Sequence, residues 1–323
     1  MALTDMKVFN QYLMEATAET LGQRIEQFNG ASNGAIVLTS MNFEGDFFQR
    51  SFYSALHSAQ RRVDRYAGQS SAAATALSQL QENSVKVAGG FGPISFEPGQ
   101  MTWLQKNESE AIAVISEQLS EAIMQDQLNS GIAAAVGAIS NQPAATNDVS
   151  GTPAAITYSA LNNTHSKFGD RSGALVAQVM TGSMYHKLIG QNLSNVNELF
   201  RAQNVTVVDI LGKVSVVTDA PALSESGAPN LDKVLSLTSG GITVMDGSDV
   251  ITNMETSNGQ TRIETTMQAD YSFGLGLAGY AWDTASGGKS PDDAALATGA
   301  NWNKVMDDIK NTAGVITIGS ADE

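Results

Sequence analysis

Two long stretches of the chain carry apolar residues at helical spacing. In residues 4–28 they fall near one side of a helix that Thr4 or Asp5 can cap. In the second stretch, Asn107 and Glu110 have the spacing of a capping box, and the pattern continues towards Pro143. If it is continuous, this second helix has about 33 residues and a length of roughly 50 Å, against a mean of ~11–12 residues. The stripes consist of Met6, Phe9, Leu13, Leu21, Ile25 and Phe28, and of Ile112, Ile115, Leu119, Ile123, Leu128 and Ile132.

Short apolar runs bounded by Gly, Pro, Asn and Asp predict strands in the rest of the chain. Helices are expected at 158–168 and 183–193, and Ser183 can cap the second of them. The stretch after residue 153 has an α/β-like order of helices and strands, and no internal repeat is evident. The expected strands are 34–39, 174–180, 204–209, 213–218, 234–237, 241–245, 261–267 and 271–277.

The end of the chain predicts a short helix followed by a strand. Asn301 can cap a helix over 302–310, and Val315, Ile316 and Ile318 form an apolar run after it. A strand at the extreme C-terminus indicates that the terminus is tied into a sheet.

Two segments have the composition of connections. Residues 66–100 begin with a stretch rich in Ser, Ala and Gln and continue through several glycines, which indicates an extended, partly flexible excursion built on strands. Residues 141–153 read NQPAATNDVSGTP, the composition of a linker.

Composition excludes several classes of protein. The 323 residues carry a net charge of -15 and only 16% charged residues, so the chain is a poor general binder of nucleic acid or of anionic membranes. There is no cysteine, which excludes disulfides, iron–sulfur clusters and thiolate zinc sites. No apolar run is long enough for a membrane span, and the N-terminus lacks the pattern of a secretory signal. Synthesis and folding in a cytoplasm is the expectation.

Candidate catalytic chemistry is weak throughout. Residues 274–279 fit GxGxxG, but a Gly/Ser loop follows instead of a helix, so we interpret them as a glycine-rich strand. His57, His165 and His186 are not paired at metal-binding spacing, and the loop around Asp246 lacks a full calcium pattern. No nucleophile elbow or P-loop occurs. We therefore predict a protein without catalytic, cofactor-binding or metal-binding residues, which is not an enzyme.

One basic cluster stands out in this acidic chain. Arg61, Arg62 and Arg65 would share one side of a helical turn. We interpret them mainly as partners for the surplus carboxylates, within the chain or between subunits, with contact to DNA as the lesser alternative.

The order of these segments resembles the major capsid proteins of tailed bacteriophages with the Hong Kong 97 fold. The resemblance rests on the early helix, the extended segment, the long helical rod and the unit FGDRSGALVAQVMTGSMYHKLIGQNL at 168–193. The tail, with Asp292-Asp293-Ala294-Ala295 and Asn301-Trp302, is similar to the end of many such proteins. The resemblance covers nearly the whole chain, although its motifs are patterns of structure and not of chemistry.

The resemblance implies an α+β, Hong Kong 97-like capsid fold in five parts. These are an N-terminal arm at 1–33, an extended loop with flanking peripheral-domain strands at 34–105 and the spine helix of the peripheral domain at 106–145. An axial domain at 146–255 and a return to the peripheral domain with the C-terminal strand at 256–323 complete it. In such capsids the extended loop reaches across a neighbouring subunit, which makes Arg61, Arg62 and Arg65 candidates for an intersubunit contact.

The function that the resemblance implies is that of a structural virion protein. It self-assembles as hexamers and pentamers into the icosahedral head that encloses the double-stranded DNA of a tailed phage. Its other partners would be separate scaffolding and portal proteins, with decoration proteins as a further class, and assembly would take place in the host bacterial cytoplasm. Many relatives carry a long N-terminal scaffold-like segment that is removed during maturation, whereas here only about 30 residues precede the first expected strand. Either scaffolding is a separate protein or this chain is a cleaved product with a new N-terminus, and Met1 favours the separate scaffold.

Two other classes remain open at this point. The acidic, cysteine-free composition also suits another self-assembling lattice or filament, such as a flagellin-like, surface-layer or encapsulin-type shell protein. Flagellins, however, end in long helices, whereas this chain is expected to end in a strand. An enzyme with an unrecognised site is the third alternative.

Overall fold

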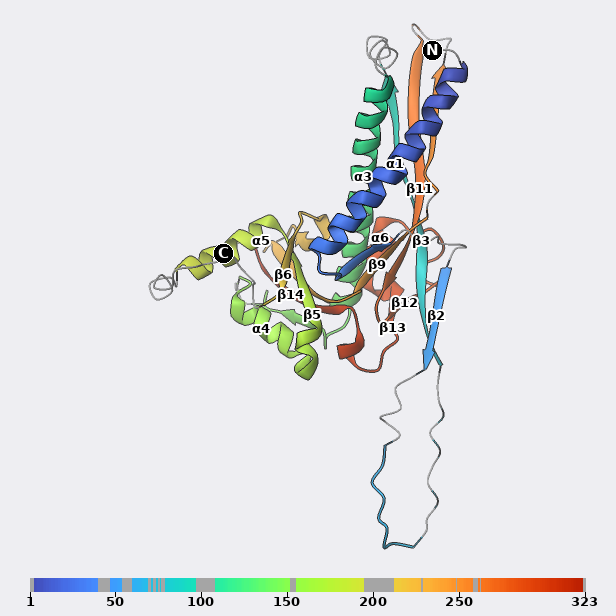
Figure 1. Ribbon diagram of the computed structural model, residues 1–323. Coiled ribbons are helices and arrows are strands. Elements are labelled where there is room, and N and C mark those ends of the chain that lie inside the picture. The colour runs from blue at the N-terminus through green and yellow to red at the C-terminus, as the bar shows by residue number, and fades with distance from the viewer. Residues whose placement is uncertain are drawn as a thin grey trace.

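Two mixed sheets and one long helix organise the chain in a computed structural model (Figure 1). The structure describes residues 3–39, 47–53, 60–68, 71, 74, 76, 79–96, 108–151, 155–194, 212–227, 229–247, 249–257, 261 and 263–321. The helices are α1 (Leu3–Ala31), α3 (Glu108–Ser140), α4 (Tyr158–Ser166), α5 (Gly182–Ser194) and α6 (Asp293–Ala297). Short 3₁₀ helices are η2 (Gly169–Ala174), η4 (Pro221–Leu223), η5 (Gly299–Asn301) and η6 (Ile309–Asn311).

The first sheet combines strands from both ends of the chain. Its order is β1-β9-β11-β3-β2, and β10 pairs with the part of β11 that precedes its pairing with β9. The long strands β3 and β11 run antiparallel from the body of the molecule into an upright column beside α1 and α3 (Figure 1). The strands are β1 (Ile36–Thr39), β2 (Phe47–Tyr53), β3 (Gln79–Phe96), β9 (Ile242–Asp246), β10 (Ile251–Ser257) and β11 (Glu264–Leu277).

The second sheet has the C-terminal strand near its centre. Its order is β4-β14-β8-β5-β6, with β7 pairing β8. The terminal strand β14 runs parallel to β4 and antiparallel to β8. β12 and β13 form a separate two-stranded sheet, and in the sequence they lie between β11 of the first sheet and β14 of the second. The strands are β4 (Thr146–Asp148), β5 (Leu175–Met180), β6 (Val214–Val217), β7 (Ser224–Glu225), β8 (Leu231–Thr238), β12 (Tyr280–Trp282), β13 (Trp302–Lys304) and β14 (Gly314–Ser320).

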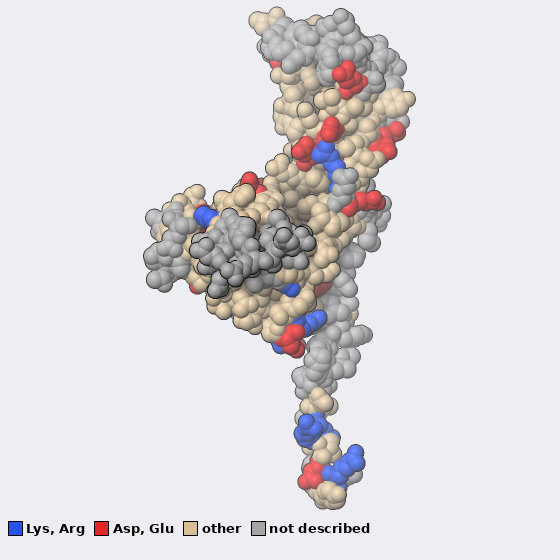
Figure 2. Space-filling model, turned by 60° about the vertical axis from the view of Figure 1, so that its left-hand side comes forward, with Lys and Arg blue, Asp and Glu red and all other residues tan. Residues whose placement is uncertain are grey.

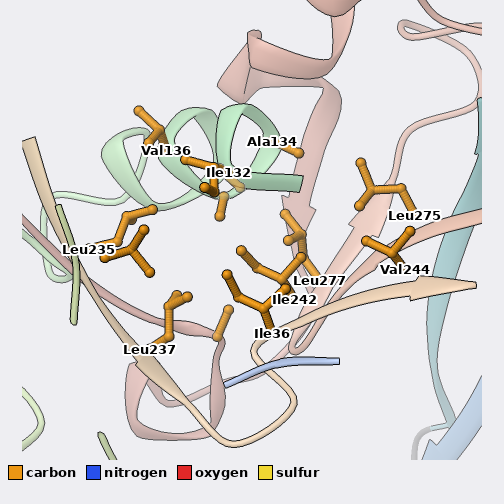
Figure 3. Packing of buried hydrophobic residues seen from close by; sticks show 14 of the residues in the cluster. Ile36, Ile132, Ala134, Val136, Leu235, Leu237, Ile242, Val244, Leu275 and Leu277 are labelled. Atoms are coloured by element: carbon orange, nitrogen blue, oxygen red, sulfur yellow. The ribbon is translucent and has the colours of Figure 1, made fainter. Parts of the chain in front are cut away.

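The C-terminal half of α3 joins the two sheets through one core. Ile132 and Val136 of this helix lie between Ile242 of the first sheet and Leu235 of the second (Figure 3). The helix is rich in Ala and Gly there, which allows close approach: a Cβ on Gly131 would stand 3.0 Å from Ile242. The two sheets therefore share one apolar core, because each packs its inner face against the same helix.

The structure confirms the two long helices, the α+β class and most of the expected strands, including the terminal strand β14. The expected strands 261–267 and 271–277 are one continuous strand, β11, with a register shift between Met267 and Ala269. Strand β10 was missed because its sequence, ITNMETS, is mostly polar. The expected strand at 204–209, the cap Asn107 and His57 lie outside the described residues.

The expected helix over 302–310 is wrong. Trp302 begins β13 and lies directly opposite Trp282 of β12, with the two ring centroids 5.0 Å apart and both side chains buried. Asn301 does not cap a helix; its side-chain amide donates to the carbonyl of Ala295, 2.9 Å away. Burial of the two indoles against each other outweighs the local helix preference, because large aromatic side chains contribute more free energy than helix propensity does.

Another correction concerns the start of α5. The hydroxyl of Thr181, and not that of Ser183, accepts a hydrogen bond from the backbone N–H of Met184, at 3.3 Å. The helix begins at Gly182, one residue before the expected cap, so Ser183 lies inside it and is exposed.

A buried polar cluster fastens α4 to the second sheet. The His165 Nε2 atom lies 3.0 Å from the hydroxyl of Ser236 and 3.2 Å from the side-chain amide of Gln178. The hydroxyls of Thr164 and Thr317 are 2.6 Å apart beside it. His165 is thus a buried residue with hydrogen-bond partners, as expected for a core histidine, whereas His186 is exposed.

We expect the folded protein to lose stability in acid because of His165. Burial, aided by the charge of Lys213, lowers the pKa of His165 from 6.5 to about 4. The folded state therefore binds the proton less readily than the unfolded chain. The contribution of His165 to the free energy of unfolding is fully present above the unfolded pKa and is lost as the pH falls from about 6.5 towards 4. Between pH 7 and about pH 5 we expect a loss of about 2 kcal/mol from this group.

Chemical denaturation of the protein at the two pH values measures this loss. His165→Gln, which keeps a polar group but cannot titrate, should lose about 2 kcal/mol less than the wild type over the same interval. An equal pH dependence in the two proteins would show that other groups dominate acid lability.

Candidate assembly surfaces

Charge is unevenly distributed over the molecule. Carboxylates are spread over the upright column, while basic side chains gather at the far end of the long loop that extends from the opposite end of the body (Figure 2). Among the described side chains of the column, formed by α1, the first half of α3, β10 and the adjoining parts of β3 and β11, Arg24 is the single basic residue. The column's carboxylates are Glu15, Glu19, Glu26, Glu110, Glu117, Glu121, Asp126, Glu255, Glu264 and Asp270.

The end of the loop, residues 60–68, is fully exposed to solvent and is here called the basic tip. It holds Arg61, Arg62 and Arg65, which form no ion pair with any other described residue. Its backbone is not helical, so the three arginines do not share the side of a helical turn that the spacing suggested. The carboxylate of Asp64 accepts a hydrogen bond from the backbone N–H of Tyr66 at 2.9 Å and holds a local turn.

Apolar side chains accompany the charges of the basic tip. Tyr66 is 101% exposed and Val63 is 64% exposed. Fully exposed aromatic and arginine side chains together are typical of protein interfaces, where both residue types are enriched. Sequence reasoning singled out the three arginines but missed Tyr66 and Val63, whose exposure the sequence does not reveal.

The column is held together by charged contacts between its elements. Arg24 of α1 reaches Glu117 at 2.9 Å and Glu121 at 3.5 Å, both on α3. The hydroxyl of Tyr271 in β11 donates to Asp126 of α3 at 2.7 Å, and burial raises the pKa of Asp126 above its usual range. These contacts leave α1 attached along α3, with its opposite face open to solvent.

The C-terminal tail clamps the end of α3. Trp302 donates from its indole nitrogen to the carbonyl of Leu296 at 2.9 Å, and the amide of Asn141 in the turn after α3 reaches the carbonyl of Gly299 at 3.2 Å. A Cβ on Gly137 would stand 2.2 Å from the carbonyl oxygen of Ala297, so the two backbones are in direct contact. Of the residues noted in the tail, Asn301 and Trp302 are buried and serve packing, whereas Asp292 is exposed and caps α6.

The sequence candidates for nucleotide and metal binding have structural roles in the described part of the chain. Gly274 and Gly276 lie within strand β11, and a Cβ on Gly276 would meet the hydroxyl of Ser84 at 2.5 Å, which confirms the interpretation as a glycine-rich strand. The carboxylate of Asp249 accepts from the backbone of Ser272 at 2.8 Å, a structural contact. Within the described residues no group of three or more metal-ligating side chains occurs, and no helix is long and apolar enough to cross a membrane.

The fold is that of phage capsid proteins. The structure matches the capsid of cyanophage Pam1 with a TM-score of 0.54 and 11% identity, over 88% of this chain and 88% of that chain. It matches a protein of Mycobacterium phage Adephagia with a TM-score of 0.54 and 10% identity, over 88% of each chain. The capsid of Ralstonia phage GP4 matches with a TM-score of 0.53 and 10% identity, over 90% of this chain and 88% of that chain.

The sequence itself identifies the family. The model of the Gp13-like family, described as major capsid protein 13-like, matches residues 5–316, so the chain belongs to this family. Comparison with curated proteins gives no match. The protein is a major capsid protein, a structural subunit that forms the head of a tailed phage and resides in the virion.

Proposed function

We propose that this protein assembles as hexamers and pentamers into a closed icosahedral shell around double-stranded DNA. The family match over residues 5–316 carries the proposal, because it covers almost the whole chain and makes self-association the function. Closed shells require repeated contacts between different surfaces of identical subunits. The basic tip and the acidic column are two such surfaces, and Arg61, Arg62 and Arg65 are the proposed intersubunit contacts.

We further propose the five-part division of the chain into N-terminal arm (1–33), extended loop (34–105), spine helix (106–145), axial domain (146–255) and return segment (256–323). The pairing of the strands supports a refinement. β9 and β10 pair with the first sheet and belong with the peripheral part, whereas β14 pairs with the second sheet and belongs with the axial part.

Separate scaffolding and portal proteins, with decoration proteins as a further class, are the partners that such a head requires. We propose that assembly takes place in the host bacterial cytoplasm. The family match concerns the capsid subunit and names no partner. Co-purification with assembling heads would identify these proteins.

Electron microscopy of the purified protein, expressed with and without its scaffold, tests the proposed function. We expect closed shells of uniform size. Filaments would favour a different lattice, and discrete small oligomers would favour an enzyme. A stable monomer by light scattering in the presence of the scaffold would contradict the proposal.

Binding to duplex DNA should be weak and independent of sequence. The chain carries 33 acidic against 18 basic residues, so most of its surface repels phosphate. We expect a filter-binding titration at ~150 mM salt to give a dissociation constant within the non-specific range of 10⁻⁴–10⁻⁶ M or weaker. The binding should weaken steeply as the salt concentration rises. Sub-micromolar binding by the isolated subunit would instead indicate a nucleic-acid-binding role.

A further inference from the structure

We propose that the basic tip of one subunit docks on a ridge of carboxylates along α1 of a second copy of this chain. The ridge consists of Glu15, Glu19 and Glu26, with Tyr12 at its N-terminal end. This inference rests on the proposed function and goes beyond it by naming the surface that receives the tip.

The ridge lies on the side of α1 that faces away from the molecule. At 100° per residue, Glu15, Glu19 and Glu26 fall within about 40° of one another around the helix. Leu13, Thr17, Leu21 and Ile25, which are buried, lie on the opposite side. Tyr12 is 57% exposed and continues the ridge. The three carboxylates are therefore displayed together on a rigid outer surface.

These carboxylates lack a balancing charge within the described part of the chain. None of them forms an ion pair there, whereas Glu117 and Glu121 of α3 already share Arg24. Glu15 and Glu19 stand four residues apart, so their like charges repel and weaken the isolated helix. A basic partner would remove this repulsion, which gives the ridge a physical reason to bind one.

The basic tip matches the ridge in charge, size and chemistry. Arg61 and Arg65 are separated by at most ~14 Å of extended chain, and Glu15 and Glu26 by ~16 Å of helix, so three cations can face three anions. Arginine binds carboxylates through paired hydrogen bonds. Tyr66 and Val63 supply apolar contact area beside the charges, and Tyr12 supplies it on the ridge.

The contact must form between two molecules. Figure 1 shows α1 along the upright column and the loop that carries the tip extending from the opposite end of the body. The tip therefore points away from its own ridge. A second copy is the partner that always accompanies the chain in a head, and it carries the complementary surface.

Charge reversal in both surfaces tests the pairing. The tip variant carries Arg61→Glu, Arg62→Glu and Arg65→Glu; the ridge variant carries Glu15→Lys, Glu19→Lys and Glu26→Lys. We expect each to lower the yield of heads at least about ten-fold, and the combination of both to recover most of it, because the charges are again complementary. Circular dichroism and thermal unfolding of each subunit identify any variant that fails to fold.

The matched control reverses three carboxylates on the outer face of the column's sheet. Glu255→Lys, Glu264→Lys and Asp270→Lys together change the charge by the same amount as the ridge variant. Combined with the tip variant, they should not restore heads. Rescue by this control, or failure of the folded ridge variant to rescue, would overturn the proposal. A tip variant that forms normal heads with reduced DNA content would also overturn it and assign the tip to the nucleic acid.

Chemical crosslinking provides a second test that does not depend on charge. The chain has no cysteine, so Arg62→Cys with Glu19→Cys introduces the only two thiols. A short bis-maleimide should join subunits covalently in assembled heads and not in dilute subunits. Arg62→Cys with Glu255→Cys is the control. Normal heads of the Arg62→Cys, Glu19→Cys variant that show no intersubunit crosslink would contradict the docking inference while leaving the proposed function intact.

Discussion

Leu119→Asp should abolish head assembly, with the largest effect of any single change considered for this chain. Leu119 lies in the middle of α3, is 0% exposed and belongs to the main apolar core together with Leu21 and Ile25 of α1. Aspartate there would place an unpaired carboxylate in that core and remove the packing of the leucine. We expect a loss of about 4 kcal/mol or more, against a total stability of ~5–15 kcal/mol for a typical domain.

Two variants on the same helix serve as controls. Gln118→Ala, at an exposed neighbouring position, should change stability by less than ~0.5 kcal/mol and leave heads unaffected. Ile115→Asp should have an intermediate effect, because Ile115 is only half-buried at the edge of a smaller cluster. Soluble expression, chemical denaturation and electron microscopy measure the series. Normal assembly of Leu119→Asp would show that the buried face of α3 has been assigned incorrectly.

Gly137→Ala should destabilise the protein by about 3 kcal/mol, although alanine is ordinarily the better residue in a helix by ~1 kcal/mol. The reason is the contact between two backbones. A Cβ at position 137 would stand 2.2 Å from the carbonyl oxygen of Ala297, and a backbone oxygen cannot rotate away. Relief of the overlap requires the C-terminal tail to move off α3, which weakens the Asn141–Gly299 hydrogen bond of 3.2 Å.

Gly190→Ala in α5 is the matched control. Position 190 is exposed, and a Cβ there meets nothing within 4 Å. The same chemical change should therefore stabilise the protein by ~0.5–1 kcal/mol. Thermal or chemical unfolding of the two variants should give shifts of opposite sign. A stabilising effect at both positions would mean that the tail does not pack directly against α3.

The parts of the fold that the sequence predicts well are those whose residues and boundaries are characteristic of one element. The helix from 108 to 140 consists mainly of good helix formers and ends before Pro143, and its observed length of 33 residues agrees with the expectation. The early helix was predicted from its cap and apolar positions, and strand β14 from a short apolar run after Gly314. In contrast, β10 has polar residues on both of its faces, and only Thr252 and Met254 are buried. Its sequence therefore lacks the alternation of apolar and polar residues that predicts a strand.

The assembly surfaces were predicted only in part. The three arginines are visible in the sequence because they are the single basic cluster of an acidic chain. Their helical arrangement was wrong, because exposed backbone at 60–68 has no packing partner among the described residues that would stabilise a helix. The ridge on α1 can be read from the spacing of Glu15, Glu19 and Glu26, but only the burial of Leu13, Thr17 and Leu21 shows that it faces solvent.

The sequence by itself determined the two long helices, the terminal strand, the absence of cysteine chemistry and the family resemblance. Each of these depends on the identity of neighbouring residues or on the order of segments. Only the tertiary structure decided that β9 and β11 join the same sheet as β1, that β14 lies between β4 and β8, and that Trp302 pairs with Trp282 as a strand. Strand pairing and aromatic packing join residues that are distant in the chain, and the free energy of such contacts outweighs the local preferences that a sequence pattern records.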